Sequence, residues 1–264
     1  MDAIVQSFPI FLLIFCRITA FFVVVPVFSA KNVPNTFKIG LGFFLSFLIF
    51  LSYGMKQTIV PDAGYLLYVV REVLIGLLMG YMVYLFFSVV QTAGAFMDLQ
   101  IGFAMANVVD PMTGTSSPLL GNFKYMLLIL VFLMMNGHHF LLTGLMNSYE
   151  WIPLTNEFFT QLENGTVTDF ISRSFANTFL LAIQLAAPMV VAMFLTDVGL
   201  ALLAKTAPQY NMFVIGIPLK LLVGLLLLVL LMPGMASMFE RLFSILFENL
   251  EQLMGKMQGV RSNE

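Results

Sequence analysis

Six long apolar segments constrain what this chain can fold into. They span residues 8–28, 37–53, 65–90, 125–145, 175–203 and 212–232. Each is much longer than the usual strand of about 5–6 residues, and none shows the alternation of a half-buried strand. Because roughly twenty apolar residues are needed to cross a bilayer, segments of this length predict helices in a membrane. We therefore expect an all-α, integral membrane protein.

The composition agrees with this class. Apolar residues make up 60% of the 264 residues and charged residues only 10%, whereas about 25% of the residues in a soluble domain are charged. The net charge of −2 lacks the clustered Lys and Arg that bind phosphate backbones, so nucleic acid is excluded as a partner. Arg17 interrupts the first apolar segment where a signal peptide has its apolar core, so we expect this segment to be retained. One domain is predicted over residues 1–264.

Residues 147–173 form the longest polar stretch and contain Trp151 and Pro153. A Trp beside polar residues is typical of the membrane interface, which predicts an interfacial loop here. Lys and Arg are scattered over the other connections. No side of the membrane therefore carries the positive excess that marks the cytoplasmic face, and no topology is assigned.

Charged residues lie inside or at the edges of the apolar segments. They are Arg17, Arg71, Glu72, Asp98, Asp197 and Lys220. A charge that faces lipid at mid-bilayer costs at least about 2.5–3.5 kcal/mol, so these groups should face protein or a water-filled path. The chain is therefore expected to need polar partners.

Glycines accompany several of these charges at helical spacing. One pair is Gly76 and Gly80, and two further stripes are Gly94, Asp98, Gly102 and Gly216, Lys220, Gly224. Spacing i, i+4, i+8 places each stripe on one helix face, and glycines let helix backbones approach closely. Two interpretations of the stripes stay open. Each charge has its own local partner, or the acidic and basic stripes contact each other or a neighbouring subunit.

Catalytic, cofactor-binding and metal-binding constellations are missing from the sequence. The adjacent His138 and His139 would point about 100° apart on a helix, whereas two imidazoles on one metal usually need i, i+3 or i, i+4 spacing. Because they follow Asn136-Gly137, the pair indicates a helix end or loop. Neither a spaced nucleophile and base nor a phosphate-binding glycine loop can be assigned. We expect a protein that is not an enzyme.

Residues 104–118 differ from the apolar segments on either side, because they include Asp110-Pro111, Gly114 and several Ser and Thr residues. Irregular backbone at membrane depth is tolerated only where it is buried in protein or lines an aqueous cavity. Considered alone, this segment is either an ordinary surface turn or a loop that lines a passage.

A set of short motifs runs along nearly the whole chain. In order they are Arg17 with Pro26, Pro34 with Lys38, Glu72-x3-Gly76-x3-Gly80, Gly94-x3-Asp98-x-Gln100-x-Gly102, Asp110-Pro111, Asn136-Gly137-His138-His139, Ala207-Pro208-Gln209-x-Asn211-x-Phe213 and Gly216-x-Pro218-x-Lys220. No single motif is specific, but the ordered set resembles the FliR family of flagellar type III export gates.

The resemblance implies a subunit of the export gate in the flagellar basal body, in the cell inner membrane. Its implied partners are FliP and FliQ subunits and FlhB, and its implied cargo is unfolded flagellar proteins. The implied fold is a FliP-like helical portion joined to a FliQ-like helical hairpin, as part of a tilted helical spiral. The related injectisome subunit leaves the choice between the two machines open.

Contacts between helices or with neighbouring subunits are then expected at buried charges, at glycines and at the polar turn before the last apolar segment. The residues are Arg17, Glu72, Gly76, Gly80, Gly94, Asp98, Gly102, Asp197, Pro208, Gln209, Asn211, Gly216, Lys220 and Gly224.

By the same resemblance, residues 106–117 correspond to a channel plug. The plug residues expected are Ala106, Asn107, Val108, Val109, Asp110, Pro111, Met112, Thr113 and Gly114. Val108, Val109 and Met112 would close the channel by apolar contact, because an unbranched Met side chain repacks readily.

Residues 235–258 carry apolar residues at helical spacing, with acidic and polar residues mostly opposite, and predict an amphipathic helix. A helix in the lipid interface favours Lys and Arg, whereas acids outnumber bases here until the last residues. We expect this helix to dock on a protein partner.

An alternative function is a secondary transporter, in which Glu72, Asp98, Asp197 and Lys220 would form an intramembrane proton or ion relay. A transporter should work alone or as a symmetric oligomer. A gate subunit should be unstable or inactive without other membrane proteins.

Overall fold

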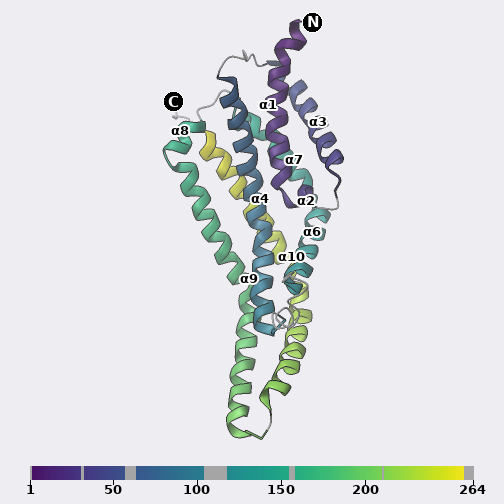
Figure 1. The fold of residues 1–264 in the computed structure, drawn as a ribbon, viewed down its shortest axis with the longest axis vertical. Coiled ribbons are helices and arrows are strands. Elements are labelled where there is room, and N and C mark those ends of the chain that lie inside the picture. The colour runs from purple at the N-terminus through teal and green to yellow at the C-terminus, as the bar shows by residue number, and fades with distance from the viewer. Residues whose placement is uncertain are drawn as a thin grey trace. The chain divides into compact units, whose positions relative to one another are not determined.

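The computed structural model describes residues 2–30, 33–56, 64–103, 118–154, 158–209 and 211–258, without the side chains of residues 2–7, 56, 212 and 213. All regular elements in these ranges are helical (Figure 1). Long runs of Leu, Phe, Met and Ala without alternation leave a helix as the structure that satisfies the backbone within each segment. The prediction of an all-α protein is confirmed.

The helices differ widely in length. They are α1 (Asp2–Val24), α2 (Pro26–Ser29), α3 (Asn35–Ser52), the 3-10 turn η1 (Gly54–Lys56), α4 (Tyr65–Ile101), α6 (Leu119–Met134), α7 (Gly137–Trp151), α8 (Phe158–Glu163), α9 (Thr166–Thr206) and α10 (Met212–Gln258). Prolines lie inside α1, α9 and α10. Membrane helices tolerate such prolines because neighbouring groups satisfy the freed carbonyls.

Several helices are long and apolar enough to cross a membrane. Among the described residues these are α3, α4, α9 and residues 214–258 of α10, and the broken pair α6 and α7 passes the same test as one span. Residues 8–24 of α1 form a shorter apolar helix. The chain is therefore an all-α membrane protein, as its apolar segments predict.

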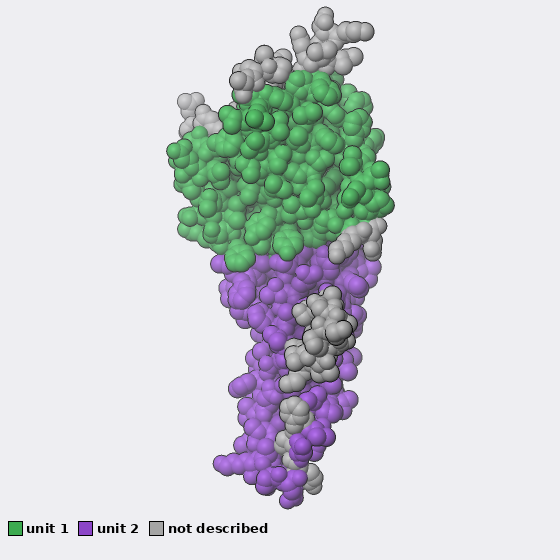
Figure 2. Space-filling model, viewed as in Figure 1, with its two compact units in different colours: residues 1–85, 136–175, 244–264 green, residues 86–135, 176–243 purple. Residues whose placement is uncertain are grey.

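The chain divides into two compact units, shown in green and purple in Figure 2. Unit 1 comprises residues 1–85, 136–175 and 244–264, and unit 2 comprises residues 86–135 and 176–243. In unit 1, α1 packs against α3 (Figure 1). The division falls within α4, α9 and α10, so each unit is assembled from distant parts of the sequence. A single domain over residues 1–264 stays a prediction.

The interfacial loop predicted for residues 147–173 is wrong. Helix α7 continues to Trp151, α8 follows, and α9 begins at Thr166. Ile152, Leu154, Phe158 and Val167 are buried in this stretch. Most of its described polar residues, such as Glu163 and Asp169, are exposed on these helices, whereas Ser148 is buried.

The apolar segment 125–145 is two helices, which break at Met135 and Asn136. Asn136 has φ 57°, in the left-handed region. Asn is one of the few residues besides Gly that adopts this conformation readily. The helix end indicated by Asn136-Gly137 is therefore found there.

Residues 235–258 are the last part of the long helix α10 and not a separate helix. Phe239, Leu246, Leu250 and Leu253 are buried along it. Acids such as Glu248 are exposed, so the two faces differ as the periodicity predicts.

Candidate functional site

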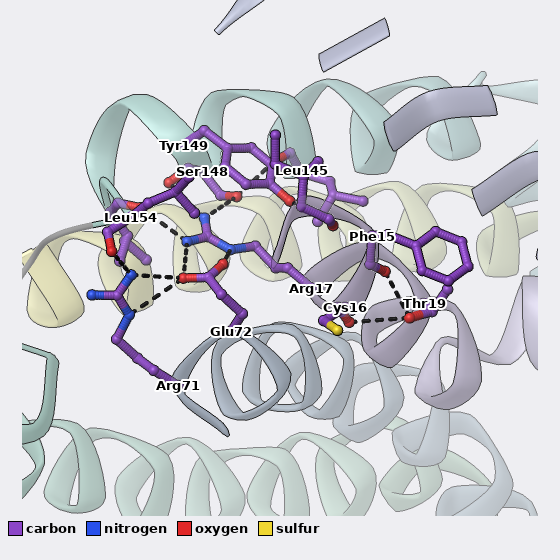
Figure 3. A network of polar contacts seen from close by, with 12 residues as sticks. Phe15, Cys16, Arg17, Thr19, Arg71, Glu72, Leu145, Ser148, Tyr149 and Leu154 are labelled. Carbon is purple, nitrogen blue, oxygen red and sulfur yellow. Dashed lines mark hydrogen bonds and ion pairs between the residues drawn. The ribbon is translucent and has the colours of Figure 1, made fainter. Parts of the chain in front are cut away.

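A buried cluster of charges lies in unit 1, where α1, α4 and α7 meet (Figure 3). It consists of Arg17 on α1 and of Arg71 and Glu72 on α4, each at most 1% exposed. Helical periodicity turns one face of each helix inward, and these three charges lie on those faces. The removal of three charges from water is costly unless each is paired and hydrogen-bonded.

Every N–H of the Arg17 guanidinium has an acceptor. Nε donates to Oε2 of Glu72 at 2.6 Å and Nη2 donates to Oε1 of Glu72 at 3.1 Å. Nη1 donates to the carbonyl oxygen and to Oγ of Ser148 at 3.1 and 3.0 Å, and Nη2 also reaches the carbonyl oxygen of Ile152 at 3.0 Å. This bidentate, fully satisfied arrangement is the strong form of an Arg–carboxylate pair.

Arg71 shares the same carboxylate. Its Nε and Nη2 donate to Oε1 of Glu72 at 3.3 and 2.9 Å, and Nη2 also donates to the carbonyl oxygen of Leu154. Two guanidinium groups on one carboxylate leave the cluster with a net charge of +1. The carbonyl oxygens of Ser148 and Ile152, at the C-terminal end of α7, carry the negative end of that helix dipole and face the excess charge.

Two tyrosines complete the cluster. The Arg17 guanidinium lies 4.1 Å from the centre of the Tyr149 ring, within the range of a cation–π interaction. The Tyr149 hydroxyl donates to the carbonyl oxygen of Ile14 at 3.1 Å. The Tyr53 ring lies 6.0 Å from the Tyr149 ring. A tyrosine phenol is neutral near pH 7, and burial raises the pKa of Tyr53 further above its ordinary value.

The Gly76 and Gly80 pair packs α4 against α1 in the same unit. A Cβ at Gly76 would overlap the carbonyl oxygen of Arg17, and one at Gly80 would lie 2.9 Å from Cβ of Val24. The absence of side chains at these positions lets the two backbones approach closely enough for Arg17 to reach Glu72. The pair therefore makes a contact within this chain.

In unit 2, Asp98 holds the start of α6. The Leu120 N–H donates to both carboxylate oxygens of Asp98, at 3.2 and 3.1 Å. The residue before α6 is Pro118, which supplies no side-chain cap. A carboxylate from another helix thus accepts a hydrogen bond from an N–H that the first turn of α6 leaves unpaired. Its negative charge is also stabilised by the positive end of the α6 dipole.

Gly94 makes this contact possible. A Cβ at Gly94 would overlap Cα of Gly121, so α4 and α6 touch backbone to backbone. Lys124, one turn along α6, is 4% exposed and its Nζ lies 2.7 Å from Sδ of Met97. A buried acid, Asp98, and a buried base, Lys124, are therefore both present where α4 and α6 pack together.

Lys220 and Asp197 form an ion pair in unit 2, between α10 and α9. Nζ lies 2.8 Å from Oδ1 of Asp197 and 3.0 Å from Oδ2, and the two side chains are 20% and 40% exposed. The Gln100 side-chain amide donates to Oδ2 of Asp197 at 3.2 Å. Asp98 and Lys220 thus have separate partners, which is the local interpretation of the two charged stripes. A direct Asp98–Lys220 pair is not what the structure has.

The remaining glycines of the two charged stripes, Gly102, Gly216 and Gly224, differ in how closely they are packed. A Cβ at Gly224 would lie 2.8 Å from the Ile101 side chain, so α10 contacts the end of α4 there. A Cβ at Gly216 would lie 3.5 Å from Leu200 on α9, an ordinary contact. Gly102 has φ +100° and nothing nearby. It is needed for its backbone conformation where α4 ends and not for close packing.

The polar turn between α9 and α10 contains Pro208, Gln209 and Asn211. Pro208 and Gln209 are exposed, and the Asn211 carbonyl oxygen accepts from the N–H groups of Val214 and Ile215. The turn therefore ends one helix and starts the next. The expected plug residues Ala106 to Gly114 lie outside the described residues.

Sequence reasoning missed several members of these clusters. Ser148 and Tyr149 lie in the stretch that the sequence assigns to a loop, and Gly121 and Lys124 lie just before the predicted apolar segment 125–145. Arg71 was noticeable as a charge in an apolar segment. Lys124 could have been noticed in the same way, because it is a charged residue next to a strongly apolar segment.

The clusters attach helices to one another. Within the described ranges, no group of three or more His, Cys, Asp or Glu side chains could hold a metal ion. His139 is exposed, and Nδ1 of His138 is buried without a partner. Each acid in the clusters is engaged by an arginine, a lysine or a backbone N–H.

Comparison with known proteins adds a relationship that covers almost the whole chain. The family described as "Bacterial export proteins, family 1" matches residues 8–246. The chain is 39% identical to the flagellar biosynthetic protein FliR of Bacillus subtilis (strain 168), over 96% of this chain and 98% of that protein. It is 32% identical to FliR of Escherichia coli (strain K12), over 91% of each chain. It is 31% identical to the Yop proteins translocation protein T of Yersinia pestis, over 89% of this chain and 90% of that protein.

Proposed function

Since the chain belongs to the family of bacterial export proteins, family 1, we propose that it works as a membrane-embedded subunit of a flagellar type III protein export gate. The observation that carries this function is the alignment with a FliR protein over nearly the full length of both chains. The injectisome protein of Yersinia pestis is a more distant relative of the same family. The flagellar assignment therefore has the stronger support.

The buried clusters fit a subunit that acts by its architecture. Glu72, Asp98 and Asp197 are each held by groups on another helix, so they stabilise helix packing. A general acid or base needs a carboxyl group within reach of a substrate, and none of these three is free for that role. We infer a component that is not an enzyme and that depends on other proteins for energy.

The partners we propose are FliP and FliQ subunits and FlhB, in the cell inner membrane at the flagellar basal body. The support is the large apolar surface of the helices of unit 2. Phe194, Leu195, Leu222 and Leu230 are each 60–69% exposed on α9 and α10. Apolar side chains on this scale need lipid or other polypeptides as cover. Unfolded flagellar proteins are the proposed cargo.

The implied FliQ-like hairpin corresponds to α9 and α10 in this proposal. The Lys220–Asp197 pair and the Gly216–Leu200 contact join the two helices, and a short polar turn connects them. We assign the remaining helices to the FliP-like portion. The tilted spiral of the assembled gate is part of the same proposal.

For the plug we propose the segment 106–117, by resemblance to the family. The neighbouring helices give this idea a physical basis. Before the segment, α4 carries Gly94 and Asp98, and after it α6 carries Gly121 and Leu120. These residues touch one another in pairs. The helices on either side of the segment are therefore joined at the Gly94–Gly121 and Asp98–Leu120 contacts.

The plug has a direct test. Deletion of residues 107–115 should make the resting gate leak small solutes, because the apolar closure by Val108, Val109 and Met112 is removed. The measurement is the permeability of cells or vesicles to ions and to a small dye, with a deletion of residues 57–63 as the control. An unchanged permeability would contradict a plug at this place.

The alternative function is a secondary transporter with an intramembrane relay. A relay needs acids that can release and accept protons along a path. Glu72 lies between two buried arginines and Asp197 is paired with Lys220. These pairings favour a static role, and they make the transporter the weaker proposal.

The decisive experiment is complementation in a Bacillus subtilis strain that lacks its own FliR. The chain should restore swimming and the export of flagellar subunits, and a tagged copy should co-purify with the strain's other export-gate membrane proteins. A purified chain that stays monodisperse alone in detergent, and that moves small solutes in vesicles unaided, would overturn the gate assignment. Empty vector serves as the negative control.

A further inference from the structure

A groove in unit 1 lies outside the clusters described so far. It runs between α7 and the last turns of α10, encloses a cavity of about 180 Å³, and is lined by Phe140, Asn147 and Trp151 on α7 and by Phe247, Glu251 and Met254 on α10. We refer to it as the α7–α10 groove. Sites for small molecules usually enclose about 300–1,000 Å³, so this groove has room for one long side chain rather than for a metabolite.

Helical spacing creates the groove. Phe140, Gly144, Asn147 and Trp151 follow one another at intervals of three or four residues, so they share one face of α7. A Cβ at Gly144 would lie 3.3 Å from Leu250, so the missing side chain lets α10 approach. The Phe140 and Phe247 rings lie 5.3 Å apart at one side.

The lining is aromatic and acidic at once. Phe140 and Trp151 are 59% and 39% exposed, so both rings are open to contact from outside the unit. The Glu251 carboxylate forms no ion pair with any residue in the described part of the chain. Glu251 is exposed at the rim of the groove, so its carboxylate is open to a cation from another polypeptide, and burial of that cation against the rings would strengthen the attraction.

The chemistry of this lining selects a guanidinium group. Aromatic faces attract cations, and a planar guanidinium also stacks on a ring while it donates two parallel hydrogen bonds to a carboxylate. The Asn147 side chain offers a further carbonyl acceptor at the edge. A phospholipid presents its amine together with a phosphate, which Glu251 would repel, so a lipid headgroup suits the groove less well.

We propose that the α7–α10 groove receives an arginine side chain from an apolar helix of a neighbouring export-gate subunit. The proposal rests on the assembly put forward above, and it adds the chemistry of one contact. The arginine would stack on Trp151 and pair with Glu251, while apolar residues on both sides of it would cover Phe140. The excess of acids in the C-terminal part of α10 acquires a specific partner in this way.

The test places a photoreactive benzoylphenylalanine at Thr143, an exposed residue of α7 that also lines the groove. Crosslinking is performed in native membranes, and the crosslinked peptide is identified by mass spectrometry. The expected product is a peptide of a co-assembled membrane protein with an arginine within one helical turn of the crosslink. Glu251→Arg should lower the yield at least about tenfold, because it places a like charge opposite the incoming guanidinium group. The matched Glu248→Arg, on an exposed acid of the same helix outside the groove, should leave the yield unchanged.

Replacement of the identified arginine by Glu, together with Glu251→Arg, should restore the crosslink. The inference is overturned if the probe crosslinks lipid, a second copy of this chain, residues 259–264 of its own chain, or a peptide without a basic residue. It is equally overturned if Glu251→Arg and Glu248→Arg have the same effect. Co-purification of wild-type chain with the other subunits is measured in parallel. If the assembly forms but the crosslink does not depend on Glu251, this inference fails while the proposed function stands.

Discussion

Glu72→Gln is the substitution for which the structure makes the sharpest quantitative prediction. The change keeps the shape of the side chain and removes its charge. Glu72 now accepts four hydrogen bonds from two guanidinium groups, of Arg17 and Arg71. The Gln side chain offers one oxygen, and its NH2 group faces donors. Two buried cations are then left without a counter-ion.

The expected cost follows from this count. Loss of one partner of a buried pair destabilises a protein by about 3–5 kcal/mol, because the remaining charge is buried and uncompensated. At about 1.4 kcal/mol per factor of ten, the ratio of folded to unfolded protein falls by roughly two to three and a half powers of ten. Typical stabilities are about 5–15 kcal/mol, so this change removes a large share of the total.

The assay measures thermal unfolding of detergent-purified protein and the amount of protein in membranes, with Glu163→Gln as a matched control on the exposed end of α8. The control should lie within about 0.5 kcal/mol of wild type. A second variant replaces Arg17 and Arg71 with Met and Glu72 with Leu. It should be more stable than Glu72→Gln, because an apolar cluster carries no unpaired charge. The reasoning is refuted if Glu72→Gln costs under about 1 kcal/mol, or if the apolar triple variant is the less stable of the two.

Three further predictions concern unit 2. Gly94→Ala should destabilise the protein by about 1–3 kcal/mol in thermal unfolding, because its Cβ would overlap the Gly121 backbone. Gly199→Ala, on α9 with open space around it, should stabilise by up to about 1 kcal/mol through helix propensity, and equal effects at both glycines would contradict the close contact. Asp98→Leu should cost about 0.5–2 kcal/mol in the same assay by uncapping α6, whereas Asp98→Asn, which keeps an acceptor for Leu120, should cost less. Lys220→Asp should impair swimming in the complementation strain and Asp197→Lys should restore it in the double variant, while combining Lys220→Asp with Asp98→Lys should not. Rescue by Asp98→Lys, and not by Asp197→Lys, would mean that Lys220 pairs with Asp98 and would contradict the Lys220–Asp197 pair.

Part of this protein can be derived from the order of its residues alone. The all-α membrane class follows from the length of the apolar segments and from the cost of unsatisfied backbone groups in lipid, since both are local properties. The break at Asn136 and the turn at Pro208 are also local, because they depend on the conformations that one or two residues adopt. The demand that Arg17, Glu72 and Asp98 be covered follows from their charge and their apolar surroundings.

The partners of those charges are decided only by the tertiary structure. Arg17 binds residues 55 and 131 positions away along the chain, and no periodicity indicates which of many distant groups it meets. Helical spacing allowed Asp98 and Lys220 either to pair with each other or to have separate local partners. In the structure, Asp98 caps α6 and Lys220 pairs with Asp197. Such choices depend on which backbones can come close, and that is set by contacts such as Gly76 with Arg17 and Gly94 with Gly121. A sequence states what each side chain requires, and packing in three dimensions determines which group supplies it.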